Sequence, residues 1–460
     1  MKKFLTNALP GFLTLLSLNS LGQSPQVWTT TANQTTLLQK VSNAPSSQAS
    51  VTITVDPAKT FQTIDGFGYT LSGGSAQLIN QLNPATKKAL LQELFGNQGI
   101  KISYLRISVA ASDLHDHSFT YDEVEKGATD PELKNFTLKE DDAQGTGLIP
   151  LLKEIKAIQP GIKIMASPWT APIWMKSNQS YVGGSLLPQY YETYARYLVK
   201  YILAMKAKGI NIDALTPQNE PQHGGNDPSM VVSAEESAAF IRDHLGPAFR
   251  KNGIKTKIIV WDHNCDNPQY PITILNDQKA RQYIDGSAFH LYNGTPDALS
   301  VVKKAHPDKN LYFTEQWTGS KGTFDGDLQW HVKNVIIGTL RNYSKIALEW
   351  NLANDPQFNP HTPSGCTECK GALTINKNDV QRNVSYYIVS HASKFIPAGS
   401  KRIYSSEAEN ISTVACVTPP GKTVLIVLNE NKANTTIRVS GKGKTFTVSV
   451  NANSVSTIVW

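Results

Sequence analysis

The chain has 460 residues, of which 40% are hydrophobic and 18% are charged. This composition excludes an intrinsically disordered protein, and the length predicts one large domain with a smaller one attached. The formal net charge of +7 is spread along the sequence and forms no basic arm. The charge therefore gives no indication of a nucleic-acid-binding protein.

The N-terminus has the pattern of a secretory signal peptide, which we assign to residues 1–22. A positively charged start at residues 1–3 leads into an apolar stretch over residues 4–21, and Ser20 and Gly22 are small residues that suit signal peptidase. The stretch is barely long enough to span a bilayer, so a membrane anchor is the less favoured alternative. The sequence predicts a secreted or periplasmic protein without a stable membrane anchor.

Short apolar runs of β type alternate with amphipathic, helix-like segments from residue 60 to residue 395. Near-continuous apolar strands separated by helices are typical of parallel strands that are buried on both faces. Eight such units favour an α/β fold of the (β/α)8 type, the TIM barrel, over an open sheet. The predicted strands are residues 63–67, 102–107, 162–166, 212–215, 257–261, 286–290, 311–314 and 346–350.

The helical pattern ends near residue 400, and short alternating strands follow. We expect residues 396–460 to form a C-terminal β-sandwich domain. Residues 23–59 form a polar leader with strands near residues 27–28 and 51–55, and these strands are expected to complete the sandwich. A carbohydrate-binding role for this domain is an alternative, but a structural role is favoured.

Two glutamates stand at the carboxyl ends of predicted strands. Glu220 follows the fourth strand and Glu315 ends the seventh, and these strands face one another across the mouth of a barrel, where active sites lie. Retaining glycoside hydrolysis needs one protonated carboxyl group and one ionised carboxylate, about 5–5.5 Å apart. A single glutamate at such a position is more often a helix N-terminal carboxylate, but the pair predicts Glu220 as general acid/base and Glu315 as nucleophile. Because the charge of Glu315 is nearby, we expect a raised pKa for Glu220.

Six motifs occur in order along the chain: Thr-Ile-Asp-Gly-Phe-Gly at 63–68, Leu-Arg-Ile-Ser at 105–108, Ala-Ser-Pro-Trp-Thr-Ala-Pro at 166–172, Thr-Pro-Gln-Asn-Glu-Pro at 216–221, Thr-Glu-Gln-Trp at 314–317 and Trp-Asn-Leu-Ala at 350–353. From about residue 51 onward the chain resembles glycoside hydrolase family 30, the family of lysosomal glucosylceramidase and of microbial β-1,6-glucanases. The resemblance implies a barrel fused to a β-sandwich, retention of configuration, and no metal or other cofactor. It also implies Asn219 and Glu220 as the acid/base element and Glu315 as the nucleophile, in agreement with their positions.

Further polar and aromatic residues fall at the ends of predicted strands. Arg106 is expected to hold the nucleophile ionised through a charge-assisted hydrogen bond, and tryptophan rings offer flat faces for the C–H surface of a sugar. A lone aromatic residue in a barrel more often belongs to the core, but these rings lie in or beside the motifs. The predicted substrate-binding residues are Arg106, Trp169, Asn219, His290, Tyr292, Trp317 and Trp350.

Two other patterns contain residue types that bind metals, but a metal site is disfavoured at both. His115 and His117 would share one face of a strand, but no further ligand cluster lies near them in the sequence, so a polar loop at the barrel rim is favoured. Cys366 and Cys369 form a lone Cys-x-x-Cys, whereas a structural zinc site usually has two such pairs. In an exported protein, a disulfide is the favoured use of these cysteines.

One departure from the family pattern bears on the substrate. Glucosylceramidase-like members carry an aspartate soon after the Gly-Phe-Gly motif, but residues 69–74 hold no carboxylate here. We therefore expect a loosened end wall and an open-ended cleft, which suits an endo-acting β-1,6-glucanase with a β-linked glucan as its partner.

A glucosylceramidase or exo-acting β-glucosidase is the alternative enzyme, with a β-xylosidase or β-fucosidase further behind. A catalytically silent glycan-binding protein is the alternative outside the enzyme class, and the presence of both glutamates argues against it. The oligomeric state is left open.

Overall fold

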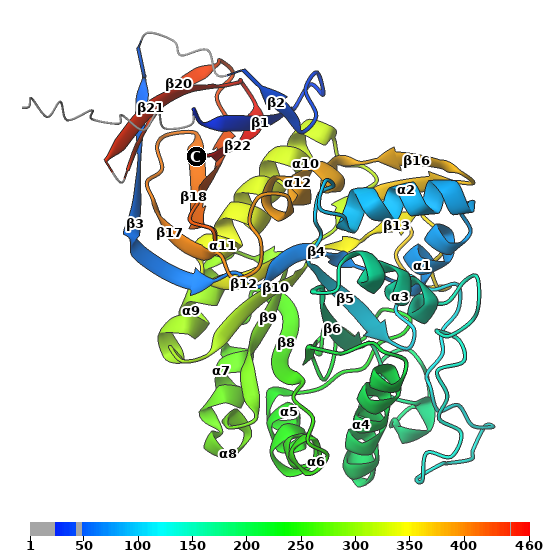
Figure 1. Cartoon of the computed structure of the whole chain (residues 1–460). Coiled ribbons are helices and arrows are strands. Elements are labelled where there is room, and N and C mark those ends of the chain that lie inside the picture. The colour runs from blue at the N-terminus through cyan, green and yellow to red at the C-terminus, as the bar shows by residue number, and fades with distance from the viewer. Residues whose placement is uncertain (1–23, 43–47, 442) are drawn as a thin grey trace, which may run out of the picture.

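Eight parallel strands close into a barrel at the centre of the molecule (Figure 1). The structure, a computed structural model, describes residues 24–42, 48–441 and 443–460, so the predicted signal peptide lies outside the described residues. The prediction of a (β/α)8 barrel is confirmed. The barrel strands are β4 (Gly66–Thr70), β5 (Tyr104–Val109), β6 (Lys163–Pro168), β7 (Ala214–Leu215), β8 (Lys257–Cys265), β9 (Ile284–Gly294), β10 (Asn310–Glu315) and β12 (Ser344–Asn351).

Helices cover the outside of the barrel and begin at recognisable sequence signals. Asn83 caps the second helix by accepting a hydrogen bond from the Thr86 N–H, and Pro84 occupies the first turn. Ser233 and Glu236 form a capping box at the start of the fifth helix. The helices are α1 (Gly73–Asn80), α2 (Pro84–Phe95), α3 (Leu148–Ile158), α4 (Tyr191–Ala207), α5 (Ala234–Phe240), α6 (Gly246–Lys251), α7 (Gln269–Asn276), α8 (Gln278–Arg281), α9 (Asp297–Ala305), α10 (Phe324–His331), α11 (Thr339–Arg341) and α12 (Val384–Ser393).

The interior of the barrel is filled by side chains and is not a channel. One residue or two from each strand except β4 contribute to a compact apolar cluster inside it, which packs the space between the strands. The packed cluster closes the interior of the barrel, so a bound ligand must lie outside it. The cluster consists of Tyr104, Met165, Ala214, Ile259, Ala288, Tyr312, Ile346 and Leu348.

A second layer of mainly antiparallel strands forms the β-sandwich beside the barrel (Figure 1). Strands from both ends of the chain build it, as predicted, because β1 pairs along its whole length with the last strand. The long β3 joins the two parts, since it pairs with β17 and β20 and then leads directly into the barrel. The strands are β1 (Gln26–Thr31), β2 (Gln39–Val41), β3 (Val51–Thr63), β17 (Lys401–Ser405), β18 (Ile411–Val417), β19 (Thr423–Asn429), β20 (Thr435–Gly441), β21 (Lys444–Val450) and β22 (Ser454–Val459).

The sandwich is packed onto the barrel rather than tethered to it. His391 of α12 contacts Thr30 and Thr457 of the sandwich through its two ring nitrogens, each at 2.9 Å. The Trp28 ring packs against Phe395 at 5.6 Å between centroids, and sandwich residues of β18, β19 and β22 belong to the same apolar core as the barrel helices. This continuous core supports the structural role that we favoured for the sandwich.

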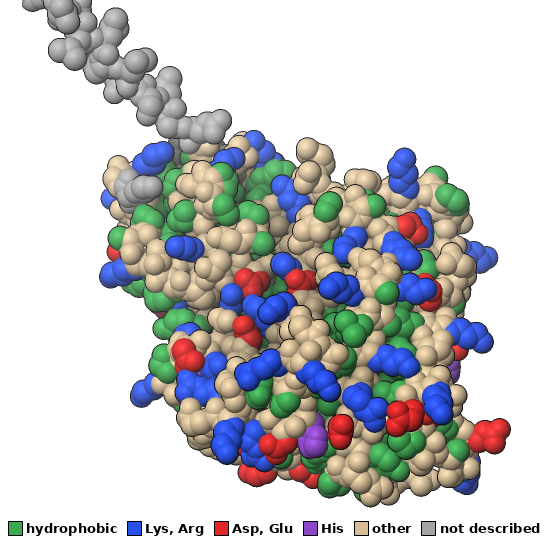
Figure 2. Space-filling model, turned by 60° about the horizontal axis from the view of Figure 1, so that its bottom comes forward, with side chains coloured by type: hydrophobic (Ala, Val, Ile, Leu, Met, Phe, Trp, Pro, Cys, Tyr) green, Lys and Arg blue, Asp and Glu red, His purple; other side chains and the backbone are tan. Residues whose placement is uncertain are grey.

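The surface agrees with the charge distribution of the sequence. Figure 2 shows Lys and Arg side chains scattered over the face that is drawn, with Asp and Glu side chains among them. None of the described helices is long and apolar enough to cross a membrane.

Candidate active site

A cavity of about 330 Å³ opens at the carboxyl ends of the barrel strands. Seven of the nine residues that we predicted for the site line it: Trp169, Asn219, Glu220, Tyr292, Glu315, Trp317 and Trp350. The other two, Arg106 and His290, lie beneath it with no exposed surface. The structure therefore brings all nine residues together, from six different strands or the loops that follow them.

Glu315 is the last residue of β10, and both of its carboxylate oxygens already accept hydrogen bonds. Arg106 Nη1 donates to Oε2 at 2.5 Å, and the Tyr292 hydroxyl donates to Oε1 at 2.9 Å. Because an arginine can only donate, these contacts stabilise Glu315 as a carboxylate. A carboxylate held in this way is suited to act as a nucleophile.

Glu220 reaches the cavity from an irregular loop after the short β7. Its backbone φ of 46° lies in the left-handed region, which is sparsely populated by residues other than glycine, asparagine and aspartate. The Glu220 N–H donates to the Asp262 carbonyl at 3.0 Å, which holds the loop in this conformation. The strained backbone turns the Glu220 side chain toward His290, whose Nδ1 lies 3.0 Å from Oε1.

The amide of Asn219 is oriented by the same arginine. Arg106 Nη2 lies 2.5 Å from Asn219 Oδ1, and since the guanidinium only donates, the amide oxygen must face it. The N–H groups of Asn219 are then left for an acceptor on a bound ligand. This is the geometry that a contact with a sugar hydroxyl requires.

The two glutamates approach one another closely. Glu220, His290 and Glu315 each offer a polar atom, and these atoms lie within 4.8 Å of one another; they are the one such potential metal-binding group among the described residues. The same atoms already pair with Arg106 and Tyr292 or with one another, so an added cation would have to displace these contacts. That the protein needs no metal stays a prediction.

The two predicted tryptophans are packed more tightly than exposed platforms would be. Trp169 and Trp350 are only 2% and 4% exposed, and their ring centroids lie 5.6 Å apart. The Arg106 guanidinium lies 4.8 Å and 5.7 Å from the two ring centroids. Their faces therefore fix Arg106 through cation–π contacts, while their remaining surface lines the cavity.

Asp262 is a buried carboxylate that the sequence analysis missed. Its Oδ2 accepts from Arg106 Nη2, Ser167 and Thr216, and its Oδ1 from Thr314 and His290. Asp262 is fully buried beside Arg106 and accepts from five donors. Its negative charge therefore holds these donors in place beneath the cavity. Trp261 and Asp262 both have positive φ, and the pairing of β8 with β9 shifts there, so a bulge turns this side chain inward.

A third carboxylate, from Asp113, also lines the cavity. It comes from the loop after β5 and is only 6% exposed. Residues 69–74 hold no carboxylate, as the sequence shows, but the loop after β5 supplies one to the cavity wall. That the cleft is open-ended stays a prediction. The His115 ring packs against Gly73, since a Cβ on Gly73 would lie 1.9 Å from His115 Nε2.

The cysteines follow the favoured interpretation. Cys366 and Cys369 form a disulfide, while Cys265 and Cys416 are buried and free. His115 accepts the Ser112 N–H at Nδ1 and belongs to no metal-binding group of the residues that the structure describes. A structural role is consistent with both the cysteine pair and His115.

Comparison with known sequences identifies the family. Residues 64–396 match the glycosyl hydrolase family 30 TIM-barrel domain, and residues 399–458 match the β-sandwich domain of the same family. The chain belongs to glycoside hydrolase family 30. The resemblance inferred from the six motifs is confirmed, and the protein is a glycoside hydrolase.

Relatives within family 30 differ in their described activities. The endo-1,6-β-D-glucanase neg1 of Aspergillus fumigatus is 34% identical over 414 residues, 84% of this chain and 82% of the relative. The lysosomal acid glucosylceramidase of Mus musculus is 30% identical over 413 residues, 84% of this chain and 79% of the relative. Among solved structures, the endo-β1,6-glucanase BT3312 matches with a TM-score of 0.88 and 35% identity, over 95% of this chain and 99% of that one.

In this family 30 enzyme, His290 contacts both Glu220 and Asp262. Its Nε2 lies 3.2 Å from Asp262 Oδ1 and its Nδ1 lies 3.0 Å from Glu220 Oε1. Burial alone would raise the pKa of Asp262, but the charge of Arg106 and the contact with His290 hold it well below its usual range. Asp262 is therefore ionised, and the proton on Nε2 is donated to it.

One further proton is shared between His290 and Glu220. Burial alone would lower the pKa of His290, but the charge of Glu315 and the bonds to Asp262 and Glu220 raise it to about 9. Burial would raise the pKa of Glu220, but the same imidazole lowers it below its usual range. Our expectation of a raised pKa for Glu220 itself is wrong. These directions place the proton on His290 Nδ1, in the hydrogen bond to Glu220 Oε1.

Replacing His290 with asparagine is expected to move the basic limb of the pH profile of kcat/KM to lower pH by at least about one unit. We expect activity to require the shared proton, which His290 loses as the pH rises through about 9. In the variant, Glu220 must hold that proton without the imidazole. The measurement is kcat/KM for an aryl β-glucoside against pH, with the exposed His117→Asn as the control. An unchanged basic limb in His290→Asn would contradict the shared proton.

Proposed function

We propose that the protein is a secreted, retaining endo-β-1,6-glucanase. The observation that carries the proposal is the pair of buried carboxyl groups over one cavity, with Glu315 accepting from Arg106 and Tyr292 and Glu220 next to His290. Their polar atoms come within 4.8 Å, which favours retention, since inverting enzymes keep their carboxyl groups about 6.5–9.5 Å apart. The pattern of residues 1–22 supports secretion.

In the first step, Glu315 attacks the anomeric carbon of the sugar while Glu220 donates the shared proton to the leaving glycosidic oxygen. The bond from the anomeric carbon to that oxygen breaks, and a covalent ester to Glu315 forms. Arg106 and Tyr292 fix the attacking carboxylate, and the Asn219 N–H groups are positioned for a sugar hydroxyl.

In the second step, the Glu220–His290 pair accepts a proton from water, which attacks the same carbon. The ester to Glu315 breaks, and the sugar leaves with the configuration that it had in the substrate. The acidic side of the pH profile follows Glu315, whose pKa is raised by burial against the opposing effect of His290 and Arg106. Activity is lost as the pH falls through that pKa, because the protonated form cannot attack.

The substrate assignment is supported by the 1,6-β-glucanases among the relatives of this chain. Endo-1,6-β-D-glucanases of Aspergillus fumigatus and Neurospora crassa are each 34% identical to it, and the endo-β1,6-glucanase BT3312 has the same two-part fold. Asp113 at the cavity wall favours a second candidate, an exo-acting β-glucosidase or glucosylceramidase. A further carboxylate can accept hydrogen bonds from the hydroxyls of a terminal sugar.

Digestion of a linear β-1,6-glucan is expected to release a ladder of oligosaccharides before glucose accumulates. An endo-acting enzyme cuts internal linkages, so the mean chain length falls early while few reducing ends have formed. Timed samples separated by anion-exchange chromatography measure this, with β-1,3-glucan and β-1,4-glucan as control polymers. Release of glucose alone from the β-1,6-glucan would support the second candidate instead.

A further inference from the structure

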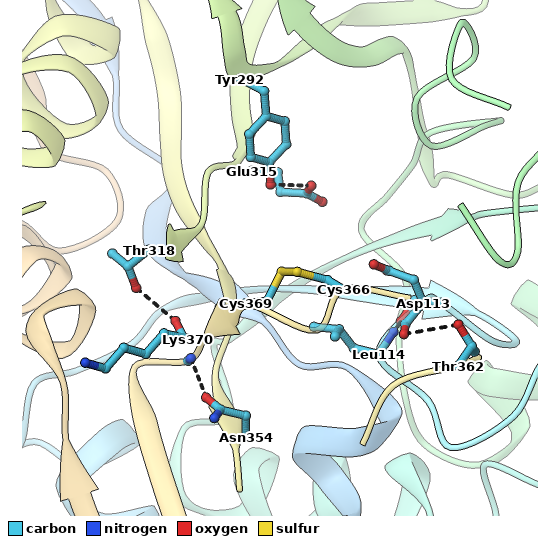
Figure 3. Close-up of a disulfide and its surroundings, with 12 residues drawn as sticks. Asp113, Leu114, Tyr292, Glu315, Thr318, Asn354, Thr362, Cys366, Cys369 and Lys370 are labelled. Atoms are coloured by element: carbon cyan, nitrogen blue, oxygen red, sulfur yellow. Dashed lines mark hydrogen bonds between the residues drawn. A yellow bond between two sulfur atoms is a disulfide. The ribbon is translucent and has the colours of Figure 1, made fainter. Parts of the chain in front are cut away.

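The Cys366–Cys369 disulfide lies in the wall of the same cavity as the two glutamates (Figure 3). Both cysteines line the cavity, and Cys369 packs against Leu114 and the rings of Trp169 and Trp350. Figure 3 shows Glu315 with Tyr292 on one side of the disulfide and Asp113 on another. A covalently closed turn of four residues therefore forms part of the surface that a bound sugar would meet.

We call residues 362–370 the cystine loop, and its first part is fastened to the loop that carries Asp113. The Thr362 N–H donates to the Asp113 carbonyl at 2.9 Å, and the Thr362 hydroxyl donates to the Asp227 carbonyl. Gly365 lies so close that a Cβ there would be 2.2 Å from the Asp113 carbonyl oxygen. The two loops touch through their backbones, and a side chain at position 365 would force them apart.

The last part of the cystine loop is fastened to the segment that follows the nucleophile. β14 (Cys369–Lys370) pairs with β11 (Thr318–Gly319), which begins three residues after Glu315. The Thr318 hydroxyl donates to the Lys370 carbonyl at 2.8 Å. The cystine loop thus spans the mouth of the barrel between the Asp113 loop and the Glu315 loop, and the disulfide closes the turn between these two attachments.

The carboxylate of Asp113 meets this turn directly. Burial and the charges of Glu315 and Glu220 raise the pKa of Asp113 to about 7, while the nearby Cys366 backbone N–H opposes that rise. The buried Oδ1 of Asp113 has no hydrogen-bond partner among the described residues. A buried carboxylate oxygen without a partner is costly unless a ligand supplies the donor. The orientation of Asp113 toward a ligand therefore depends on where the turn holds Cys366.

We propose that the Cys366–Cys369 disulfide is a positioning element for sugar binding, which fixes the Asp113 carboxylate in the cavity wall. The inference rests on the proposed function, because it assigns Asp113 a hydroxyl of the bound glucosyl unit. Without the disulfide the turn gains conformational freedom, and the Asp113 loop, which the cystine loop contacts at Thr362 and Gly365, is held less firmly. Glu315 and Glu220 keep their own partners in Arg106 and His290, so binding weakens while the chemical step is preserved.

A double-mutant cycle tests whether the disulfide acts through Asp113. We compare the wild type, Cys366→Ser with Cys369→Ser, Asp113→Asn, and all three changes together, and measure kcat and KM for an aryl β-glucoside. The disulfide variant is expected to raise KM by about 10-fold, the scale of one hydrogen bond to a charged group, with kcat within about threefold of the wild type. In the Asp113→Asn background, removing the disulfide should change KM by less than about twofold.

Glu368→Gln is the matched control, since it changes the same turn and breaks only the exposed contact with Lys321; its KM should equal that of the wild type. If the disulfide variant fails to fold, reduction of the folded wild type with a phosphine replaces it, and KM should rise by a similar factor. A lowered melting temperature with unchanged KM, or additive effects of the disulfide and Asp113 changes, would overturn the proposal.

The same set of variants can also be compared by sugar binding, without catalytic turnover. In the Glu315→Gln background, calorimetric binding of a β-1,6-linked glucose disaccharide should show the same non-additive loss of affinity. A wild type that binds this sugar but hydrolyses no β-glucoside contradicts the proposed function alone. A disulfide variant with wild-type affinity contradicts the role of the disulfide alone.

Discussion

Replacing Glu315 with glutamine is expected to lower kcat on both aryl β-glucosides and β-1,6-glucan by about 10⁴-fold or more. Glutamine keeps the shape of the side chain and can still accept from Tyr292, but it cannot form the ester to the anomeric carbon. The affinity for an oligosaccharide product should change little, because the tryptophans, Asn219 and the cavity wall remain. Steady-state kinetics and calorimetric binding measure the two quantities separately.

Glu349→Gln is the matched control for this change. Glu349 is as deeply buried as Glu315 but pairs with His331 and does not line the cavity, so its kcat should stay near that of the wild type. In Glu315→Gly, added azide can enter from the face that the carboxylate occupied, and it should restore turnover and yield the α-glucosyl azide. Retention of activity in Glu315→Gln, or an azide product of β configuration from Glu315→Gly, would show that another group is the nucleophile.

Replacing Glu220 with alanine is expected to have the second largest effect, and the effect should depend on the leaving group. Hydrolysis of β-1,6-glucan should fall by about 10²–10⁴-fold, because its alkoxide cannot depart without a proton. A dinitrophenyl β-glucoside needs no such proton, so its first step should remain fast and a burst of phenolate should precede a slow steady state. Stopped-flow absorbance of the phenolate measures both phases.

Azide also tests the assignment of Glu220. In Glu220→Ala it should attack the ester on Glu315 from the opposite face, remove the slow phase and yield the β-glucosyl azide. Gln218→Ala serves as a control at a neighbouring residue whose amide donates to the Trp169 carbonyl, and it should retain the response of the wild type to leaving groups. Equal losses on the glucan and on the dinitrophenyl substrate in Glu220→Ala would contradict its role as the acid.

The barrel could be predicted from the sequence because its signal is local. Each of its eight parallel strands is a short apolar run, and every predicted run overlaps an observed strand. The strand details that could not be predicted depend on pairing with segments that are distant in the sequence. β8 extends to Cys265 rather than ending at Trp261, since a bulge at Trp261 and Asp262 lets pairing with β9 continue. β17 was not predicted, because the five residues that form it pair with β3, more than 300 positions earlier.

The position of the site could be predicted where a residue with suitable side-chain chemistry stood within a family motif, as at Glu220 and Glu315. Asp262 and Asp113 were missed although each follows or ends a predicted strand, so a search for every carboxylate at strand ends would have found them. The distribution of protons could not be predicted in this way, because it depends on the 3.0 Å contact between His290 and Glu220, and these residues are adjacent only in the fold.

Trapping the ester intermediate shows whether Glu315 is the nucleophile. An activated 2-deoxy-2-fluoro-β-glucoside slows both steps but hydrolysis of the ester more, so the glycosylated protein accumulates and can be digested for mass spectrometry. We expect a single sugar adduct, carried by the peptide that contains Glu315 and absent from Glu315→Gln. An adduct on another residue would contradict this role of Glu315, as would hydrolysis whose first product is the α-anomer.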